Sequence, residues 1–473
     1  MRGDHLQAGR AEVMRGLAGL LASWAFCTAA QGLDSHQQLA REIYRELVEI
    51  RTVHPDGDNT ALARAVQRRL LEAGFDARDV EVVEPAPLKG NLVARLRGTG
   101  ERRPMLLLAH IDVVDAKKED WSDGLDPFKL TERDGYFYGR GTIDDKAMAA
   151  YFVANLIRLK REGFRPRRDI VVALTADEEG GTHNGVGWLL ENRRGLIDAE
   201  FALNEGAAGL LVDGVPRQLR VQVSEKSYLS FELEATNAGG HSSEPRADNA
   251  IYDLAGALER IARFELPVQM SYVLRQLAEK EAGLVEPRLA EVLRAVARGN
   301  PSQEDLRAMA ALPHYNNQMR TTCVATRVDA GHADNALPQR ARATLNCRLL
   351  PGEKPQFVQD ELQRLAGPRV TVRTKNPPYD PPATDARSPV MEAIARVGVT
   401  VWPGVEAVPV MSAGATDGSR LRSAGIPVFG VMGTFLERGE NRLHGRDERL
   451  GVRAFFEGLE FHYRLARALG AGE

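Results

Sequence analysis

The first half of the chain alternates between helical and strand-like hydrophobic patterns. Apolar Leu39, Ile43 and Leu47 recur every four residues, which predicts an amphipathic helix that begins at Ser35. The same criteria predict helices over 60–73 and 146–161 and strands at 92–96, 105–108 and 170–174. Strands that alternate with helices indicate an α/β domain with a largely parallel sheet. The strands are almost continuously apolar, as is typical of strands covered on both faces.

The pattern changes near Val221, where strands become half polar. Residues 228–235, YLSFELEA, alternate apolar and polar positions, which indicates a strand with one exposed face. The predicted order is then strand, helix, strand, strand, helix, strand, at 228–235, 249–263, 321–328, 342–349, 354–365 and 370–373, with a long charged helical stretch over 267–312. This order predicts an open-faced α+β sandwich. We therefore expect an inserted domain over 222–385 within a larger α/β domain formed by 34–221 and 386–473.

The N-terminal segment has the outline of a secretory signal. Arg15 is followed by an apolar run at 17–26 and by small residues at 28–30. We expect a signal within residues 1–33, with a plain N-terminal helix as the alternative. The run is too short to be a stable membrane anchor. A cleaved signal predicts a periplasmic or secreted protein, and otherwise the protein is expected in the cytoplasm.

Composition narrows the classes of partner. The chain has 473 residues, a formal net charge of −3 and 43% hydrophobic residues, values ordinary for a globular protein. No strongly basic balance points to nucleic acid as a partner. The three cysteines, Cys27, Cys323 and Cys347, form no CxxC or Cys/His cluster, so the sequence offers no pattern for a cysteine-ligated structural zinc.

Candidate metal ligands gather where apolar strands end or where a helix begins. They occur in LLLAHIDVVD, GRGTIDDK, LTADEEGG, LNEGAAG and RLHGRDERL, which contain His110, Asp112, Asp144, Glu178, Glu179, Glu205 and His444. Ligands of open α/β sheets bind outside the carboxyl ends of the strands. Carboxylates and imidazoles suit zinc, and a carboxylate can bridge two ions that together activate water and polarise a carbonyl.

Each of these segments also has a purely structural explanation. His110 could be a core histidine, Asp144 could cap the helix that begins at Lys146, and adjacent Glu178 and Glu179 could be a solvated pair. Their occurrence together, in this order and flanked by glycines or small residues, favours a metal site.

The motifs resemble those of the M20 family of metallopeptidases, which includes glutamate carboxypeptidases, aminoacylases and carnosine-type dipeptidases. The resemblance rests on HIDVV at 110–114, GRGTIDDK at 139–146, ADEEGG at 176–181, GGHSSEP at 239–245, DNALP at 334–338, Arg348, GATDGSRLR at 414–422 and His444. It implies a zinc-exopeptidase-type catalytic domain with an inserted α+β lid. It also implies two Zn²⁺ ions, with Co²⁺ or Mn²⁺ as substitutes.

The resemblance assigns roles to the ligand-type residues. Asp144 would bridge the two ions, with His110 and Glu205 completing one site and Glu179 and His444 completing the other. Glu178 would be the general base, and Asp112 would orient His110 from behind. In this family the bond after the bridging aspartate is often cis, which here is Asp144–Asp145.

Substrate contacts are also implied by the resemblance. His241 is expected to stabilise the oxyanion, often across a dimer, while Asn335 and Arg348 would contact the carbonyl and carboxylate of the substrate. Gly414 would provide a backbone contact. The segment near 265–315 resembles the longer lid of carboxypeptidase S-like and N-acyl amino acid hydrolase members, so a homodimer through the lid stays an open expectation.

Three functions are compatible with these residues. The leading hypothesis is a two-zinc carboxypeptidase or dipeptidase acting on a small peptide with a free carboxylate, and the alternative is an N-acyl amino acid amidohydrolase. A non-catalytic binding protein on the same fold is disfavoured because every ligand position is filled by a competent residue.

The cysteines at 323 and 347 are predicted to be cross-strand neighbours. The predicted strands at 321–328 and 342–349 lie on either side of Asn335, and both cysteines are equally far from it. They are expected to be either disulfide-bonded, if the compartment is oxidising, or two buried free thiols.

Overall fold

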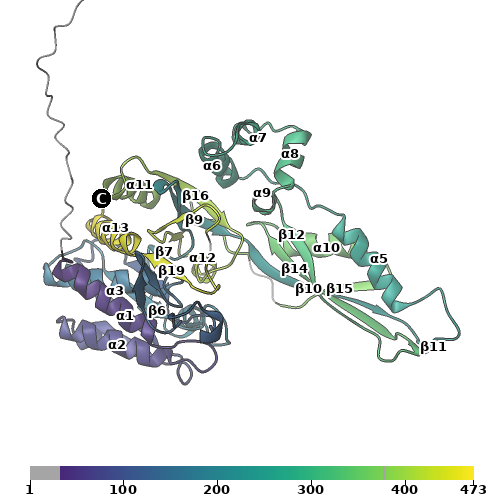
Figure 1. Cartoon of the computed structure of the whole chain (residues 1–473), viewed down its shortest axis with the longest axis horizontal. Helices are drawn as coiled ribbons and strands as arrows, with labels where there is room; N and C mark the ends of the chain where they lie inside the picture. Colours follow the sequence, from purple (N-terminus) through teal and green to yellow (C-terminus); the bar gives the residue numbers. More distant parts are fainter. Residues whose placement is uncertain (1–31, 377–379, 441) are drawn as a thin grey trace, which may run out of the picture.

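The structure is a computed structural model that describes residues 32–376, 380–440 and 442–473. A larger body is built around a sheet covered by helices, and an elongated arm projects from it (Figure 1). The apolar run of the predicted secretory signal lies outside the described residues, so the predicted location of the protein stays a prediction. Within the described ranges, no helix is both long and apolar enough to cross a membrane.

A ten-stranded sheet forms the middle of the larger body. Its strands follow the order β1-β2-β6-β3-β7-β17-β9-β8-β18, and β16 pairs with β9 off this path. They are β1 (Val80–Val83), β2 (Asn91–Leu96), β3 (Met105–His110), β6 (Ile170–Thr175), β7 (Phe201–Asn204), β8 (Gly209–Val212), β9 (Val215–Glu225), β16 (Glu406–Ser412), β17 (Val428–Gly430) and β18 (Phe435–Glu437). The three strands predicted in the first half of the chain, β2, β3 and β6, are confirmed.

The large sheet is mixed rather than largely parallel, with five parallel and four antiparallel pairs among its described strands. Strands β6, β3, β7 and β17 run parallel, whereas β1, β2 and β6 pair antiparallel. Strands β8 and β9 form an antiparallel hairpin whose turn residues Asp213 and Gly214 have φ values of 53° and 73°. Positive φ at both positions is typical of a tight two-residue hairpin turn. Because the turn is so short, β8 and β9 pair directly in the antiparallel orientation. A parallel pair would need a much longer crossover connection.

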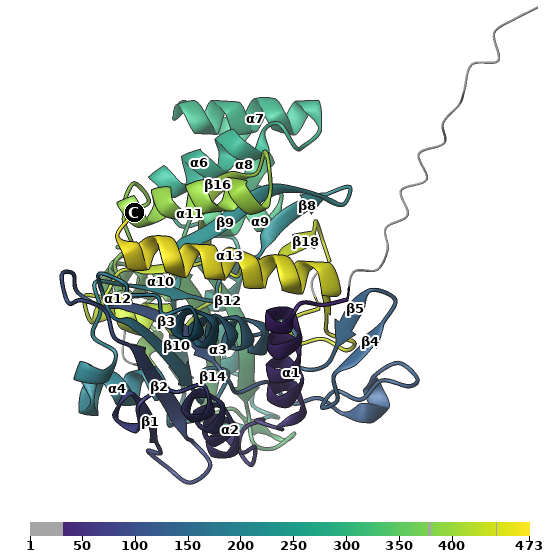
Figure 2. The same ribbon diagram turned by 90° about the vertical axis from the view of Figure 1, so that its left-hand side faces the viewer.

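Helices cover both faces of this sheet. One face carries α1 (Ser35–Glu49), α2 (Asn59–Glu72), α3 (Lys146–Arg161), α11 (Pro389–Val401) and α13 (Val452–Ala471), and the other carries α4 (Gly185–Asn192) and α12 (Gly418–Ser423). In β3, Leu107 packs in the apolar cluster on the face of α1 and α3, and its neighbour Leu106 packs in the cluster on the face of α4 and α12. This alternation is expected for a strand buried on both sides. Helices α1, α3 and α13 lie together on the face shown in Figure 2.

The arm is the predicted α+β sandwich. Its sheet has the order β12-β14-β10-β15, with every pair antiparallel, and α5 and α10 pack on one face. The elements are β10 (Ser227–Thr236), α5 (Ala250–Ala262), β12 (Thr322–Ala330), β14 (Arg340–Leu349), α10 (Pro355–Ala366) and β15 (Val370–Thr374). Only Lys226 separates β9 of the large sheet from β10 of the arm. At the far end of the arm, β11 (Gly240–His241) pairs with β13 (Ala336–Leu337).

The predicted helical stretch between the strands of the arm consists of four short helices. These are α6 (Tyr272–Glu281), α7 (Pro287–Arg298), α8 (Gln303–Ala310) and α9 (Pro313–Met319). Ser271, Glu286 and Ser302 cap three of them through side-chain oxygens, and Gly299 ends α7 in the left-handed conformation. The helices share an apolar cluster of their own, and α6 packs beside β16 rather than on the arm (Figure 1).

Cys323 and Cys347 are cross-strand partners on β12 and β14, as predicted. Their Cα atoms are 4.0 Å apart and their sulfur atoms form a disulfide. Burial alternates along β14, with Cys347 facing the helices of the arm and Arg348 facing the opposite side. The structure therefore has the bonded alternative of the two that the sequence left open.

Candidate active site

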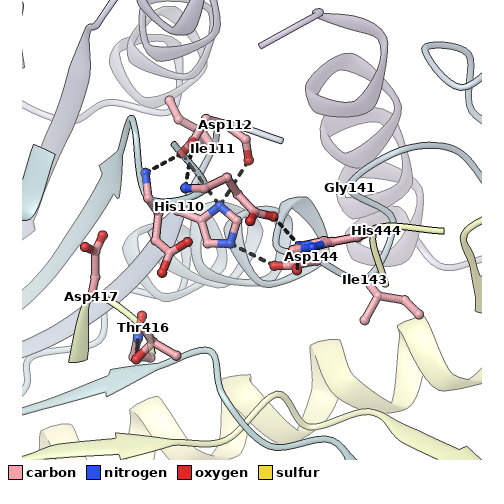
Figure 3. Close-up of polar contacts among 12 residues, drawn as sticks. His110, Ile111, Asp112, Gly141, Ile143, Asp144, Thr416, Asp417 and His444 are labelled. Carbon is pink, nitrogen blue, oxygen red and sulfur yellow. Dashed lines mark hydrogen bonds and ion pairs between the residues drawn. The ribbon is translucent and has the colours of Figure 1, made fainter. Parts of the chain in front are cut away.

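Two histidines and two carboxylates from four separate segments converge at one edge of the large sheet. His110 is the last residue of β3, Asp144 precedes α3, Glu179 follows β6, and His444 precedes β19 (Arg449–Gly451). The Nε2 atom of His110 lies 2.8 Å from Oδ1 of Asp144, and the Nε2 atom of His444 lies 3.2 Å from Oδ2 of the same carboxylate. His444 Nε2 is also 2.8 Å from Oε1 of Glu179. Asp144 is therefore shared between the two imidazoles (Figure 3).

These residues fit a site for divalent cations. His110, Asp144 and Glu179 each offer one ligand atom, and the three atoms lie within 4.8 Å of one another. Imidazole nitrogen and carboxylate oxygen are ligands that suit zinc and its neighbours in the first transition series. Hydrogen bonds to Asp144 and Glu179 raise the pKa of His444 to about 10. Metal binding would release the proton of this imidazole, because a histidine ligates a cation only when its ring nitrogen is deprotonated.

Glu178 and Glu205 add negative charge to the same region. Burial is the main cause that raises the pKa of Glu178 to about 9, and the charges of Asp417 and Glu179 add to it. Burial also raises the pKa of Glu205, which directly follows β7, and the charges of Glu178 and Asp144 act in the same direction. Buried carboxylates this close to one another need compensating positive charge. Bound cations would supply it.

Asp112 holds the loop that carries both glutamates. Its two carboxylate oxygens accept the backbone amides of Glu178 at 3.1 Å and Glu179 at 3.0 Å. The Nδ1 atom of His110 contacts the backbone carbonyl of Asp112 at 3.0 Å and lies 3.7 Å from its carboxylate. The closer contact of His110 with this residue is therefore through the main chain, while the fully buried carboxylate orients the 178–179 loop.

A buried glutamate that the sequence analysis did not single out, Glu448, organises the loop before α3. Its carboxylate accepts the backbone amides of Gly141 at 3.1 Å, Ile143 at 2.8 Å and Asp144 at 3.3 Å, and pairs with Arg140 Nη1 at 2.7 Å. The antiparallel pairing of β5 (Tyr136–Tyr138) with β19 brings these segments together; β5 also pairs with β4 (Thr131–Arg133). The Asp144–Asp145 bond in this loop is cis, as expected. The sequence signal that could have identified Glu448 was its place in the motif RLHGRDERL, four residues after His444.

The GATDG segment is tied to the end of β9. Glu225 accepts the backbone amide and the hydroxyl of Thr416, both at 3.0 Å, and pairs with Arg422 at 2.7 Å. Gly414 lies on the exposed approach to this turn, and its amide donates to Ser412 Oγ at 3.1 Å. The turn therefore has a fixed position beside the metal cluster.

Arg348 opens onto a cavity that it shares with Glu178 and Glu179. The cavity has a volume of about 910 Å³, and its wall includes Arg348, Tyr228, Glu178, Glu179 and Thr416. The guanidinium of Arg348 lies over the ring of Tyr228, 4.8 Å from its centroid. The positively charged guanidinium of Arg348 therefore lies in the same cavity as the carboxylates of Glu178 and Glu179. An anionic group of a substrate could contact the guanidinium there.

Buried Lys226, also missed by the sequence analysis, lies near this cavity at the junction of the two sheets. Its amine donates to the hydroxyl of Thr322 at 3.2 Å. Burial lowers the pKa of Lys226 to about 7, and the charge of Arg348 acts in the same direction. Its position between two strands gives no motif from which a sequence could identify it.

His241 and Asn335 lie together, far from the Asp144 cluster of their own chain. His241 pairs with Ala336 between β11 and β13, and the backbone amide of Ser242 donates to the carbonyl of Asn335 at 3.0 Å. Both residues are exposed at the far end of the arm (Figure 1). Of the residues proposed from sequence, the structure thus brings the predicted metal ligands, Glu178, Asp112 and Arg348 into one region and leaves these two outside it.

Comparisons with known proteins agree with this arrangement. The profile described as "Peptidase family M20/M25/M40" matches residues 106–468. Human N-fatty-acyl-amino acid synthase/hydrolase PM20D1 is 30% identical over 385 residues, which cover 77% of this chain and 73% of that protein. Human aminoacylase-1 is 27% identical over 439 residues, covering 91% of this chain and 95% of that protein.

Solved structures share the fold at low sequence identity. The M20 family metallo-carboxypeptidase Sso-CP2 from Sulfolobus solfataricus has a TM-score of 0.67 at 17% identity, with 91% of this chain and 99% of that chain covered. The YXEP protein of Bacillus subtilis, titled a dinuclear metal binding peptidase from the M20 family, has a TM-score of 0.59 at 15% identity, with 92% and 98% covered. Since the family profile spans well over half of its residues, the chain belongs to peptidase family M20/M25/M40.

Proposed function

We propose that the protein is a two-metal amidohydrolase that cleaves the amide bond on the amino side of an amino acid with a free carboxylate. The observation that carries this proposal is the sharing of the Asp144 carboxylate, one oxygen toward His110 and the other toward His444. A carboxylate placed in this way is suited to bridging two cations. The hydrolase character of the relatives supports the same conclusion.

The proposed ligand sets follow from this bridge. His110 and Glu205 would complete one site, and Glu179 and His444 the other, with Asp144 common to both. The proposed ions are Zn²⁺, with Co²⁺ or Mn²⁺ as substitutes. When bound, two such cations supply Lewis acidity that polarises the scissile carbonyl and acidifies the attacking water.

Glu178 is the proposed general base. It adjoins Glu179 but is not one of the three residues that form the compact ligand group. Glu178 would accept the proton of the attacking water and deliver it to the amide nitrogen as the C–N bond breaks. Its position in the wall of the cavity that also contains Glu179 supports this role, since a general base must lie within hydrogen-bond reach of the water it activates.

Arg348 is the proposed anchor of the substrate carboxylate. Its planar guanidinium can donate to both oxygens of a carboxylate and stays charged at any working pH. The cavity that it shares with Glu178 and Glu179 supports a substrate whose carboxylate lies close to the scissile bond. Gly414, beside the GATDG turn, is proposed as a backbone contact of the same substrate.

His241 and Asn335 are proposed to act in the active site of a second copy of the chain. Their position at the end of the arm, remote from the Asp144 cluster, supports this assignment (Figure 1). A histidine there would hydrogen-bond the developing oxyanion, and Asn335 would contact the substrate carbonyl. A homodimer through the lid is the partner arrangement that this requires.

Two substrate classes remain within the proposal. N-acyl amino acids come first, because the relatives named aminoacylase-1 and N-fatty-acyl-amino acid synthase/hydrolase are similar over most of this chain. Small peptides come second, supported by the carboxypeptidase title of a structural neighbour. A non-catalytic binding role is disfavoured because Glu178 and all five ligand positions carry competent residues.

Metal removal and reconstitution test the proposal. Exhaustive chelation is expected to abolish hydrolysis of N-acyl amino acids and dipeptides, and Zn²⁺ or Co²⁺ is expected to restore it with two ions bound per chain. Full activity in the metal-free protein would refute the proposed mechanism. Two bound ions without hydrolysis of either substrate class would favour the non-catalytic role.

A further inference from the structure

We infer that a second cavity beside the metal cluster binds the aliphatic acyl chain of an N-acyl amino acid substrate. This inference deepens the proposed function and rests on it. The cavity has a volume of about 720 Å³, within the range of about 300–1,000 Å³ usual for small-molecule sites. Its wall includes Gly206, which follows Glu205, and Leu443, which precedes His444. Two of its lining residues are therefore sequence neighbours of proposed metal ligands.

The second cavity and the cavity lined by Arg348 adjoin different residues of the proposed metal site. The Arg348 cavity reaches it through Glu178 and Glu179, and the second cavity through the neighbours of Glu205 and His444. Among the described residues, none lines both cavities. A substrate whose carbonyl lies at the cluster and whose carboxylate meets Arg348 would direct its acyl group into the second cavity.

The wall of the second cavity is largely apolar and comes from two parts of the fold. The large sheet and its loops contribute Leu210, Leu436 and Leu443, and the helical insertion contributes Leu277, Leu289 and Leu312. Leu312 remains 39% exposed although the insertion has an apolar cluster of its own. An apolar side chain left uncovered at the wall of a cavity favours an apolar occupant.

Three of the four charged side chains in the wall, Arg220, Glu437 and Glu440, are engaged with the protein, and the fourth, Arg438, is exposed. Arg220 pairs with Glu281 at 2.6 Å, and Glu281 also accepts the Tyr315 hydroxyl at 2.6 Å. Glu437 accepts the backbone amide of Gly214 at 2.6 Å, and Glu440 pairs with Arg449. Because these groups bond within the protein, the cavity offers a ligand mainly its apolar surface.

The Arg220–Glu281 pair also fixes the insertion in place. It joins α6 to β9, and Glu281 is fully buried. Helix α6 packs along β16 as well, so both contacts attach the insertion to the larger body (Figure 1). The insertion therefore forms one side of the proposed acyl-binding cavity. Its helix α6 packs on the larger body and not on the arm.

A chain-length series tests the inference. Hydrolysis of N-acetyl-, N-octanoyl- and N-dodecanoyl-phenylalanine would be measured with the metal-loaded protein below the micelle concentration. Burial of each methylene contributes about 0.8 kcal/mol, or about fourfold, so kcat/KM is expected to rise by at least about tenfold from acetyl to octanoyl. Binding of the same three compounds to the Glu178→Gln variant would be measured by calorimetry as a readout independent of turnover.

Leu312→Asp places a charge in the cavity wall at little cost to folding. Leu312 is the residue that caps α9 at its N-terminus, where aspartate is favoured over leucine. The variant is expected to lose about tenfold on the dodecanoyl substrate and less than about twofold on the acetyl substrate, because only the long chain loses its apolar contact. Leu71→Asp is the matched control, since Leu71 is also 39% exposed but lies on α2, outside the cavity. Ala208→Phe narrows the cavity without a charge and should have the same chain-length selectivity.

The outcomes separate this inference from the proposed function. Equal hydrolysis and equal binding of the three acyl lengths would overturn the acyl cavity and leave the amidohydrolase proposal intact. Preferential binding of the dodecanoyl compound, lost in Leu312→Asp, with no hydrolysis of any substrate would support the cavity and refute the proposed activity. A loss in Leu312→Asp that is the same for acetyl and dodecanoyl substrates would also overturn the inference.

Discussion

Glu448 accepts a hydrogen bond from the backbone amide of Asp144 at 3.3 Å, although 304 residues separate the two in the chain. Glu448 lies four residues after His444, so one carboxylate connects the loop of Asp144, the proposed bridging residue, with the loop of His444, a proposed ligand. Arg140 reinforces the connection, because it pairs with Glu448 and donates to the carbonyl of Gly445 at 3.0 Å. The two loops are therefore positioned as one unit.

Glu448→Gln is expected to weaken metal binding by about 10–100-fold, the usual effect of removing a group that orients metal ligands. The variant should also lose about 3–5 kcal/mol of stability, because buried Arg140 loses its charged partner. Chelator competition and chemical denaturation would measure the two effects. Glu460→Gln, which removes an exposed pair with Arg464, is the control and should change neither quantity appreciably. Wild-type metal affinity in Glu448→Gln would contradict the prediction.

Glu178→Ala and Glu179→Ala are expected to fail in different ways, although the residues are adjacent. Glu178→Ala should retain two metal ions and lose about 10²–10⁴-fold in kcat, as expected for removal of a general base. Glu179→Ala should lose metal, because Glu179 belongs to the compact ligand group. Metal stoichiometry and single-turnover rates would be measured on both variants. If both bind two ions equally, the assigned roles are wrong.

Arg348→Ala is expected to abolish the preference for substrates with a free carboxylate. The wild type should favour a free-acid substrate over its amide by about tenfold to a hundredfold in kcat/KM, since a hydrogen bond between charged groups contributes about 1.5–3 kcal/mol. Arg348→Lys should recover only part of this preference, because a lysine lacks the planar fork. Arg342→Ala, on the same strand but paired with Glu234, is the control. Equal rates on acid and amide in the wild type would remove the anchor role.

Mixing two inactive variants is expected to restore activity if His241 acts in the site of a partner chain. Glu178→Ala and His241→Ala should each lose about 10²-fold or more, and the heterodimer should regain one intact site. Activity would be assayed after subunit exchange, with exchange itself followed by a fluorescent label on each variant. Demonstrated exchange without any recovery would show that His241 does not act in this way.

Reduction of the Cys323–Cys347 disulfide is expected to destabilise the protein by about 3 kcal/mol, the value for a closed loop of this size, since the cysteines have a sequence separation of 24. Denaturation with and without reductant would be compared for the wild type and for the Cys323→Ala/Cys347→Ala double variant. The double variant should not respond to reductant. Two alkylatable thiols at these positions in the unreduced protein would contradict the bonded state.

The sequence was sufficient for features that depend on short segments. HIDVV, GRGTIDDK and ADEEGG each combine a strand or helix end with its functional residues, so His110, Asp144 and Glu179 could be identified locally. The Cys323–Cys347 pairing could be anticipated because both strands lie on either side of Asn335 at the same separation. The alternation that directs Arg348 away from Cys347 is likewise local.

Features that depend on pairing between distant segments could not be predicted. The Glu448 contact exists because β5 pairs with β19, across more than 300 residues of sequence. The charged composition of 267–312 indicated helices, but not that α6 would pack on β16 and complete a cavity. The antiparallel pairs of the large sheet were missed, although Asp213–Gly214 is a hairpin signal for the pairing of β8 with β9.

Lys226, the single residue between β9 and β10, is a position at which a small rotation would move the far end of the arm by a large distance. A rotation of about 10° at Lys226 would displace a point at the end of the ten-residue strand β10 by about 6 Å, because ten residues at about 3.3 Å span about 33 Å. Arg348 is the register partner of Tyr228, two residues from this fulcrum, so the same rotation would barely move it. The proposed contact between Arg348 and the substrate carboxylate would therefore change little when the arm rotates. His241, at the opposite end of the arm, would be displaced most.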